Sequence, residues 1–433
     1  MIDVQSVLSR YAPDPEEKNN IERLVHNLES RIRSITARDG IDAEPVLVGS
    51  VAKHTNLKNA DIDIFIVFSR KYRTTEMEKL GLKIGHEVLP EGVERYAEHP
   101  YVSGAIEGRK IDLVPCFRID KGSGIVSSVD RTPLHTEYVL SHLDREGQDQ
   151  VRLLKLFMKA IGVYGSEVRT RGFSGYVCEL LIINKKNFQE VLRFFSESKG
   201  RIIIPSDSDL AKKYNAPFIL QDPTDASRNA GAAVSMENLS RMKLESRLYL
   251  LEPSENFFTP KMEPAPALAR NNGTALRIIR LPRPDLVDDI IFSQGERLRK
   301  IVVEHLQERG FHVMDSDLYV GETVDVLVEA EIGILPAFVR HYGPPVDSEN
   351  SVDFVRKWGS RSFRGPYVHE DRVCADIHQE MRGIDESILS ILERSNIGKN
   401  LQAVKPLAKV IDPLATGEAF KVIGKYYSRN IVS

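Results

Sequence analysis

The fold is decided by the stretch Val46-Leu-Val-Gly-Ser-Val-Ala-Lys-His-Thr-Asn-Leu-Lys-Asn-Ala-Asp-Ile-Asp-Ile-Phe65. It predicts a short apolar strand that ends at Gly49-Ser50, a polar link, and a second strand that carries Asp61 and Asp63. Because residues i and i+2 of a strand share one face, we expect these two carboxylates to project side by side. Carboxylate oxygens suit hard cations, and two such cations about 3.5–4 Å apart commonly assist in-line phosphoryl transfer. The Gly49-Ser50 turn adds backbone N–H groups and a hydroxyl that suit a phosphate.

The Asp-x-Asp pattern alone is weak evidence, because it recurs at Asp207/Asp209 and at Asp315/Asp317. For both of these pairs we expect polar turns rich in Ser and Asp. The first pair differs because a Gly-Ser turn precedes it and apolar residues flank it on both sides.

A third carboxylate is expected close to the first pair. Residues 101–117 read as a hairpin with its turn at 107–110. Asp112 lies between two apolar residues, which places it on the polar face of a strand that is able to neighbour Asp61 and Asp63. Three such carboxylates together predict a metal-dependent nucleotidyl transfer.

The composition is that of a globular protein, with 42% hydrophobic and 28% charged residues among 433. This length predicts two to four domains. The sequence contains no run of eighteen apolar residues and no basic-then-apolar leader, so neither a membrane span nor a secretory signal is expected. The three cysteines lie far apart, which argues against a disulfide framework or a zinc site and predicts a reducing, cytoplasmic location. Because the net charge is -3, a nucleic-acid partner requires a local basic patch.

Apolar periodicity predicts helices at 15–38, 70–89, 148–161, 175–183, 230–251 and 288–310. Arg152, Lys155 and Lys159 share one face of the third helix, which is either solvated or, beside a metal site, neutralises a triphosphate. Arg228 precedes the helix at 230, where free N–H groups favour anions. His99 has two open interpretations, a ligand or a core histidine.

The C-terminal part begins after a proline-rich segment. Six prolines between residues 253 and 285 predict a domain boundary near 260–270. Strands are expected beyond it at 275–281, 312–320 and 323–331, followed by an irregular stretch at 356–376.

This irregular stretch predicts RNA-binding residues. Its cations are Arg356, Lys357, Arg361 and Arg364, interleaved with Trp358, Phe363 and Tyr367, and no acid occurs between 355 and 369. Cations beside aromatic rings are typical of nucleic-acid-binding surfaces. The alternative is a solvated loop with packed rings.

Separate motifs follow one another in a characteristic order. They are Val48-Gly-Ser-Val-Ala-Lys53, Asp61-Ile-Asp63, Arg95-Tyr-Ala-Glu-His-Pro-Tyr101, Asp112-Leu-Val-Pro-Cys116, Val129-Asp-Arg-Thr-Pro133, Arg171-Gly-Phe-Ser-Gly-Tyr-Val-Cys-Glu-Leu180, Asp222-Pro223 and Arg228-Asn229. This order resembles the archaeal, class I CCA-adding enzymes of the polymerase-beta-type nucleotidyltransferase superfamily. The resemblance covers roughly the first 250 residues and weakens after that, although Gly343-Pro-Pro345 and Gly398-Lys-Asn400 fit the C-terminal part of the family. One departure is Lys53, where relatives carry Arg; the charge is kept, but a bidentate grip on phosphate is lost.

The resemblance implies an α+β protein with a palm-like nucleotidyltransferase head on a mixed sheet, a helical neck, and an α+β body and tail with a ferredoxin-like element. The implied domains are a catalytic head at 1–147, a helical central domain at 148–265 that completes the nucleotide site, and a tRNA-binding body and tail at 266–433. The implied partners are tRNA, through its acceptor stem and TΨC region, and CTP and ATP. The oligomeric state stays open, with a homodimer as one alternative.

The resemblance also implies roles for residues. Asp61, Asp63 and Asp112 are the expected catalytic residues and the ligands of Mg²⁺. The expected nucleotide-binding residues are Gly49, Ser50, Lys53, Thr132, His135, Lys155, Tyr164 and Arg228.

The implied activity is the template-independent addition of C, C and A to the 3′ end of tRNA by two-metal-ion nucleotidyl transfer from CTP and ATP. One alternative is another template-independent RNA nucleotidyltransferase, such as a poly(A) polymerase. A second alternative is a non-catalytic RNA-binding protein on a transferase scaffold. The presence of all three carboxylates argues against this second alternative.

Overall fold

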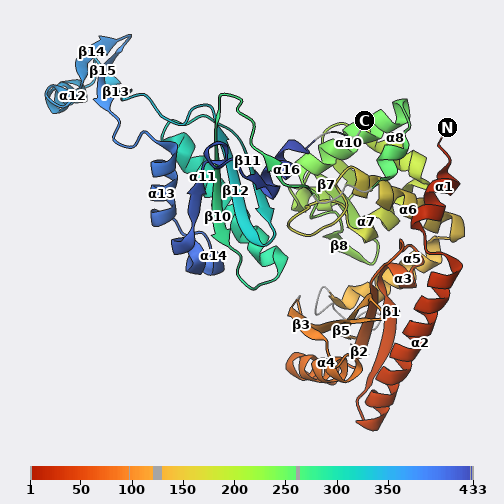
Figure 1. Ribbon diagram of the computed structural model, residues 1–433. Coiled ribbons are helices and arrows are strands. Elements are labelled where there is room, and N and C mark those ends of the chain that lie inside the picture. Colours follow the sequence, from red (N-terminus) through yellow and green to blue (C-terminus); the bar gives the residue numbers. More distant parts are fainter. Residues whose placement is uncertain (1, 97, 120–128, 260–263, 430, 432–433) are drawn as a thin grey trace. The chain divides into compact units, whose positions relative to one another are not determined.

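The computed structural model describes residues 2–96, 98–119, 129–259, 264–429 and 431 (Figure 1). The chain forms two compact units, an N-terminal unit of Met1–Lys261 with Ile431–Ser433 and a C-terminal unit of Met262–Asn430. Of the predicted boundary near 260–270, residues 260–263 lie outside the described ranges. The three-domain division stays a prediction.

A five-stranded mixed sheet, here called the head sheet, forms the first part of the N-terminal unit. Its strands are β1 (Ala43–Val48), β2 (Ile62–Phe68), β3 (Val93–Tyr96), β4 (Pro100–Ile106) and β5 (Arg109–Phe117), in the order β1-β2-β5-β4-β3. Strands β2 and β5 are parallel, and the other neighbours are antiparallel. The predicted hairpin is therefore confirmed as β4 and β5.

Two helices, α2 (Pro15–Arg38) and α4 (Thr74–Val88), cover one face of the head sheet (Figure 1). Helix α2 begins as predicted, because the Asp14 carboxylate accepts a hydrogen bond from the Glu17 N–H at 2.8 Å. Ile62 and Ile64 of β2 are fully buried against these helices. Side chains alternate along a strand, so Asp63 projects from the opposite face.

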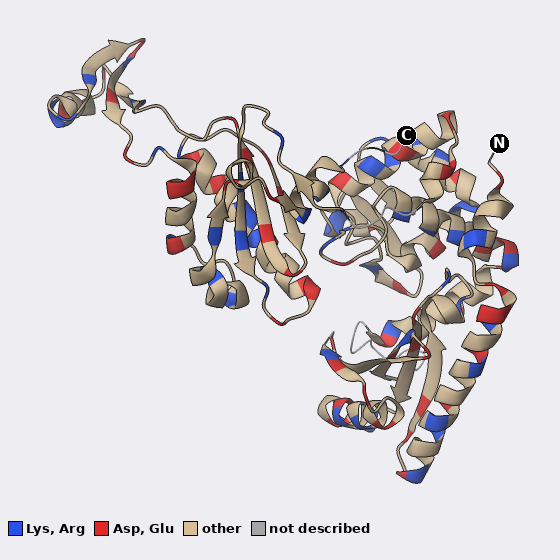
Figure 2. Ribbon diagram, viewed as in Figure 1, with Lys and Arg blue, Asp and Glu red and all other residues tan. Residues whose placement is uncertain are grey.

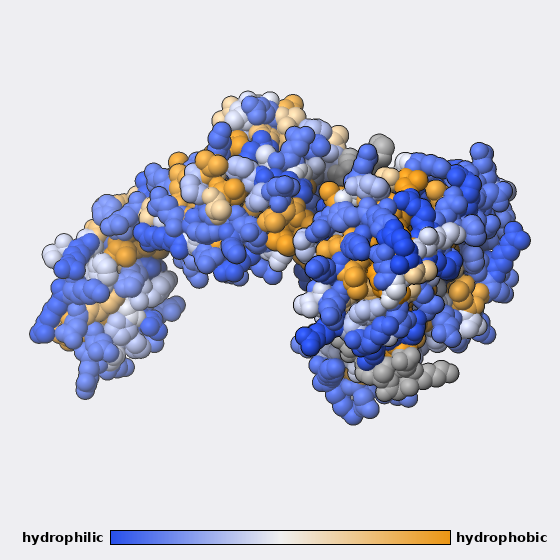
Figure 3. All heavy atoms as spheres, turned by 90° about the horizontal axis from the view of Figure 1, so that it is seen from below, coloured by the Kyte–Doolittle hydropathy of each residue, from blue (hydrophilic) through white to orange (hydrophobic). Residues whose placement is uncertain are grey.

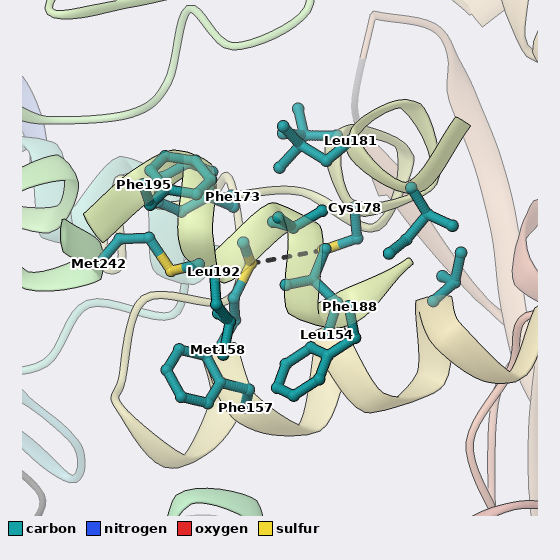
Figure 4. Packing of buried hydrophobic residues seen from close by; sticks show 14 of the residues in the cluster. Leu154, Phe157, Met158, Phe173, Cys178, Leu181, Phe188, Leu192, Phe195 and Met242 are labelled. Carbon is teal, nitrogen blue, oxygen red and sulfur yellow. Dashed lines mark hydrogen bonds between the residues drawn. The ribbon is translucent and has the colours of Figure 1, made fainter. Parts of the chain in front are cut away.

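The remainder of the N-terminal unit is mainly helical. Its elements are α1 (Val4–Tyr11), α3 (Gly49–Ala52), α5 (Thr132–His142), α6 (Arg145–Ala160), α7 (Gly175–Lys185), α8 (Phe188–Glu197), β6 (Ile202–Ile204), α9 (Leu210–Lys213), β7 (Phe218–Asp222), β8 (Asp225–Asn229) and α10 (Met236–Leu251). An apolar core joins α6, α7, α8 and α10, and in it the Cys178 thiol lies 3.5 Å from the Met158 sulfur (Figure 4). The helix predicted to begin at 230 begins at Met236 instead, because residues 230–233 form turns and the Ser235 hydroxyl caps the helix by accepting a hydrogen bond from the Asn238 N–H.

The C-terminal unit contains the predicted ferredoxin-like element. In chain order it runs through β10 (Ala275–Pro282), α11 (Asp288–Glu308), β11 (Val313–Val320), β12 (Thr323–Ala330), α13 (Ile384–Arg394) and β16 (Lys409–Ile411). This is the β-α-β-β-α-β order, and its antiparallel sheet is ordered β11-β12-β10-β16. Shorter elements complete the unit: β9 (Ala267–Leu268), α14 (Lys399–Val404), α15 (Pro413–Thr416), β17 (Ala419–Phe420) and α16 (Lys421–Tyr427).

Asp315 and Asp317 do not form the expected polar turn. Both lie in β11, and Asp317 is buried. Lys425 and Arg429 pair with Asp317 at 2.8 and 2.9 Å, and Arg429 also pairs with Asp315 at 2.8 Å, so both carboxylates form ion pairs within the C-terminal unit.

A separate three-stranded sheet, here called the small sheet, corrects the prediction of an irregular stretch at 356–376. It consists of β13 (Phe338–Pro345), β14 (Arg364–His369) and β15 (Arg372–His378), in the order β13-β15-β14, with α12 (Asn350–Trp358) packed on one face. The prediction is wrong because a tight turn at Glu370, with φ of 54°, joins β14 to β15 without any Gly or Pro to mark it.

Charges of both signs are interspersed along the helices, as α2 shows in Figure 2. Hydrophilic residues cover most of the face drawn in Figure 3. Within the described ranges, no helix is both long and apolar enough to cross a membrane.

Candidate active site

Three carboxylates converge on one edge of the head sheet. Asp63 of β2 and Asp112 of β5 are directly paired in the parallel register. Asp61 lies one residue before β2 rather than within it. The expected convergence of β2 and β5 is therefore present in the fold.

A lysine and a serine complete this group. Lys110 Nζ lies 2.7 Å from Asp112 Oδ2 and 3.3 Å from Asp61 Oδ2, and Ser103 Oγ donates to Asp112 Oδ1 at 2.6 Å. Burial, followed by the charges of Asp112 and Asp61, raises the pKa of Asp63 to about 6. Negative charge at this edge is thus incompletely balanced by the protein.

Gly49 brings the chain against the same group. Its φ is +74°, a left-handed conformation, and a Cβ at this position would overlap Oδ2 of Asp63. Ser50 follows as the second residue of the short helix α3. The Gly49-Ser50 segment therefore lies beside the carboxylates.

The donor set suits a divalent cation, because hard cations take oxygen ligands and a cation would relieve the repulsion that raises the pKa of Asp63. In the described part of the chain, no group of three or more His, Cys, Asp or Glu side chains is arranged to hold a metal ion. The ammonium of Lys110 instead contacts two of the three carboxylates.

Lys53 and Lys155 meet at a buried carboxylate. Lys53 Nζ lies 2.6 Å and Lys155 Nζ 3.6 Å from oxygens of Glu179, and Thr55 Oγ1 donates to Glu179 at 2.6 Å. Only 2% of the Lys155 side chain is exposed. These contacts bring the two predicted nucleotide-binding lysines together.

The interpretation of Arg152, Lys155 and Lys159 as a solvated face is wrong for the first two. The Arg152 guanidinium donates to the carbonyls of His54 and Asn56 at 2.5 and 2.9 Å, and Lys155 donates to the carbonyl of Thr55 at 2.9 Å. These side chains therefore tie the link between α3 and β2 onto α6. Lys159 is exposed.

A second buried carboxylate, Asp222, holds His135 and Arg228. The ring nitrogen Nε2 of His135 lies 2.9 Å and Arg228 NH1 2.7 Å from Asp222 Oδ2. Tyr176 stacks on His135 with 4.0 Å between ring centroids and donates its hydroxyl to Asp222 at 3.0 Å. Burial alone would raise the pKa of Asp222, but the hydrogen bond and charge of His135 hold it well below its usual range. Arg228 lies in β8, not at the start of the following helix.

Tyr176 links the two buried carboxylates, because Lys53 Nζ lies 5.4 Å from its ring centroid. Thr132 is the first residue of α5. Tyr164 lies near Lys155, since a Cβ at Gly175 would contact both the Tyr164 hydroxyl and the Lys155 side chain.

His99 is buried, and its Nδ1 lies 2.9 Å from Glu78 Oε1. Its Nε2 is also buried and has no hydrogen-bond partner among the described residues. The contact with Glu78 thus satisfies only one of the two ring nitrogens of His99, and both interpretations of this residue stay open.

The four predicted RNA-binding cations lie on or beside the small sheet. Arg364 pairs with Asp376 at 2.6 Å while 64% of its side chain stays exposed, and Arg356 lies 3.6 Å from Asp353. Among the described residues, neither Lys357 nor Arg361 has an ion-pair partner. Because β14 pairs with β15, Asp376 lies opposite Arg364, although no acidic residue occurs between 355 and 369.

Glu179 and Asp222 are functional candidates to which the sequence reading assigned no role. Each had a recognisable signal. Glu179 is the only acid in the apolar helix α7, and Asp222 ends an apolar strand. Isolated buried acids of this kind require partners from elsewhere in the chain.

Comparisons with known proteins agree along the chain. The nucleotidyltransferase domain model matches residues 29–135, the model of the second domain of tRNA nucleotidyltransferase matches 149–259, and the model of the C-terminal domain of CCA-adding enzyme matches 272–408. A CCA-adding enzyme of Picrophilus torridus is 46% identical over 100% of both chains, and one of Thermoplasma volcanium is 44% identical over 99% of this chain and 97% of its own. A solved structure of a cytoplasmic RNA terminal U-transferase has a TM-score of 0.46 and 15% identity over 60% of this chain and 97% of its own.

Proposed function

The chain belongs to the CCA-adding enzymes, a family of tRNA nucleotidyltransferases, and we propose which of its residues add C, C and A to the 3′ end of tRNA from CTP and ATP. The observation that carries this assignment is the pairing of Asp63 with Asp112 across β2 and β5, with Asp61 and Gly49 beside them. Nucleotidyl transfer requires positive charge at the reacting phosphate, which metal ions supply. Three neighbouring carboxylates are suited to binding such ions.

Asp61, Asp63 and Asp112 are the ligands of divalent ions in this proposal, and Mg²⁺ is the ion. When bound, such ions polarise the phosphoryl oxygen and orient the attacking and leaving oxygens. The chain contributes the acidic edge, and Ser103 fixes the Asp112 carboxylate by a hydrogen bond at 2.6 Å. Lys110 supplies positive charge to Asp61 and Asp112 until the metal ion is present.

In this proposal the nucleotide is bound by Gly49 and Ser50 beside the carboxylates and by side chains around the buried carboxylates Glu179 and Asp222. The other nucleotide-binding residues are Lys53, Thr132, His135, Lys155, Tyr164 and Arg228. Support comes from the contacts that link Lys53 and Lys155 through Glu179, and His135 and Arg228 through Asp222. Cations fixed by buried carboxylates are pre-organised for a triphosphate, so little side-chain entropy is lost on binding.

The tRNA is bound through its acceptor stem and TΨC region, and Arg356, Lys357, Arg361 and Arg364 of the C-terminal unit contact its phosphates. Two of these cations lie over aromatic rings, Arg364 at 5.4 Å from the Tyr367 centroid and Lys357 at 5.3 Å from the Trp358 centroid, which supports this part of the proposal. The proposal also includes a cytoplasmic location and the assembly of the chain as a homodimer. Sedimentation of the purified chain, with and without tRNA, tests the homodimer.

The proposed activity is tested with a tRNA that lacks its 3′ CCA. The full-length chain is incubated with this tRNA, Mg²⁺, and each of CTP, ATP, GTP and UTP singly and in pairs. We expect two C residues from CTP alone, one further A when ATP is added, and no product with GTP or UTP. A run of A from ATP alone would indicate a poly(A) polymerase, and tRNA binding without any incorporation would indicate the non-catalytic scaffold.

A further inference from the structure

Glu179 is a buried carboxylate that faces two lysines. It lies on α7, and only 1% of its side chain is exposed. Its oxygens lie 2.6 Å from Lys53 Nζ and 3.6 Å from Lys155 Nζ, and one accepts the Thr55 hydroxyl at 2.6 Å. The Lys155 ammonium also donates to the hydroxyl and the carbonyl of Thr55, at 3.0 and 2.9 Å.

The surroundings make Glu179 the main source of negative charge for these lysines. The titratable and charged groups that face the cluster are Lys53 from the end of α3, Arg152 and Lys155 from α6, Tyr164 after α6, and Tyr176, Cys178 and Glu179 from α7. Arg152 is committed to the carbonyls of His54 and Asn56 and to Asp149. Among the described carboxylates, Glu179 is the one that pairs directly with both lysines, while the charge of Asp63 on β2 also acts on Lys53.

Burial opposes the charge of Lys155. A buried ammonium loses its hydration, and burial lowers the pKa of Lys155, while the charge of Glu179 opposes this shift. Removing one partner of a buried ion pair leaves the other uncompensated, so the orphaned lysine releases its proton more readily. The position therefore demands a carboxylate, not merely a side chain of this size.

We propose that Glu179 is a positioning residue that holds Lys53 and Lys155 in place for the incoming nucleotide and keeps Lys155 charged. The inference rests on the proposed nucleotide-binding role of these two lysines. Among the described residues, no hydrogen bond or ion pair joins Glu179 to the three carboxylates of the head sheet or to the carbonyls of residues 54–56. Its effect on the reaction therefore passes through the lysines and Thr55.

The test compares the full-length chain with its Glu179→Gln and Lys155→Met variants. The kcat and the KM for CTP are measured on truncated tRNA with Mg²⁺ between pH 6.5 and 9.5, and Tm is recorded at each pH. In Glu179→Gln we expect a KM close to the wild-type value at pH 6.5. As pH rises, this KM should increase by about tenfold per pH unit. It should reach a plateau about ten- to a hundredfold above the wild-type KM, which corresponds to the free energy of one charged hydrogen bond.

The Lys155→Met variant separates this inference from the function on which it rests. It should raise the KM for CTP at every pH, without the added slope. If Lys155→Met and Lys53→Met both leave the KM unchanged, the proposed nucleotide role of the lysines is rejected, and the inference with it. If these variants weaken binding but Glu179→Gln raises the KM equally at every pH and lowers Tm, Glu179 is only structural and the inference alone is overturned.

A milder variant covers failure of Glu179→Gln to fold. Thr55→Val removes the hydroxyl that bridges Glu179 and Lys155 but keeps the side-chain volume. We expect a smaller rise of the CTP KM with the same dependence on pH. A flat ratio of variant to wild-type KM across the pH range would overturn the proposal.

Discussion

Gly49 lies so close to Asp63 that any side chain at residue 49 would overlap the Asp63 carboxylate. The same glycine has a φ of +74°, which L residues rarely adopt. One residue thus sets both the path of the chain after β1 and the space available to the central carboxylate.

Gly49→Ala should therefore disable the enzyme more than it destabilises the fold. A displacement of about 1 Å at a reacting group costs on the order of a hundredfold in rate, while a left-handed Ala costs about 1–2 kcal/mol of stability. We would measure kcat and Tm beside Gly40→Ala, because Gly40 has a φ of +63° and no neighbour within 4 Å of an added Cβ. Equal kinetic effects of the two variants would contradict the prediction.

Asp112→Ala should abolish nucleotide addition while tRNA still binds. Loss of one of three carboxylates removes several kcal/mol of metal-dependent stabilisation, which corresponds to about a thousandfold or more in turnover. Asp42→Ala is the control, since Asp42 is a surface carboxylate of the same unit that pairs with Lys71 at 3.1 Å. Single-turnover incorporation and filter binding of tRNA give the two readouts, and near-normal turnover would remove Asp112 from the site.

Asp63→Asn should stabilise the metal-free protein at neutral pH. The pKa of Asp63 is raised from 3.8 to about 6, so the folded state holds the proton more tightly than the unfolded state does. Its contribution to stability is therefore highest below pH 3.8 and falls as pH rises to about 6, by on the order of 3 kcal/mol. Denaturation in EDTA should show a gain for Asp63→Asn at pH 7.5 and little gain at pH 4. A gain of the same size at both values would assign the effect to packing instead of charge.

Arg228→Ala should raise the apparent KM for both CTP and ATP with the fold intact. A charged hydrogen bond contributes about 1.5–3 kcal/mol, so kcat/KM should fall about ten- to a hundredfold. His135, Tyr176 and Thr224 remain as partners of Asp222, so that carboxylate is not orphaned. Arg193→Ala on α8, which removes an exposed pair with Glu190, is the matched control. An effect confined to tRNA affinity would contradict this placement.

The sequence predicted those features that depend on local patterns. Alternation in β2 placed Asp63 opposite the buried isoleucines, and the cap at Asp14 marked the start of α2. It could not predict that Lys155 is buried, because its partners Thr55 and Glu179 come from segments far away in the chain. A basic stripe on a helix has the same spacing whether water or a buried carboxylate faces it.

The same limit applied to the small sheet. Cations without a nearby acid in sequence suggested an open basic stretch, yet strand pairing places Asp376 at 2.6 Å from Arg364. The turn at Glu370-Asp371 contains neither Gly nor Pro, and Asp371 alone is a weak signal for a hairpin.

Because Arg364 pairs with Asp376, we expect Arg361 and Arg364 to contribute unequally to the binding of tRNA. Arg361 has no acidic partner among the described residues, whereas Arg364 must leave Asp376 to neutralise a phosphate. Each phosphate neutralised contributes about 0.7–0.9 to the slope of log affinity against log salt. Arg361→Ala should therefore flatten the slope by nearly one, and Arg364→Ala by less.

The measurement compares full-length tRNA with an acceptor-stem minihelix at several salt concentrations. The control is the double variant Arg193→Ala/Lys212→Ala, which removes two exposed cations of the N-terminal unit. Arg361→Ala and Arg364→Ala should weaken the binding of full-length tRNA and leave turnover of the minihelix nearly unchanged, if these arginines bind tRNA phosphates that the minihelix lacks. Equal losses on both RNAs would place these arginines at the active site or in support of the fold. An unchanged slope with full-length tRNA would remove the small sheet from the RNA interface.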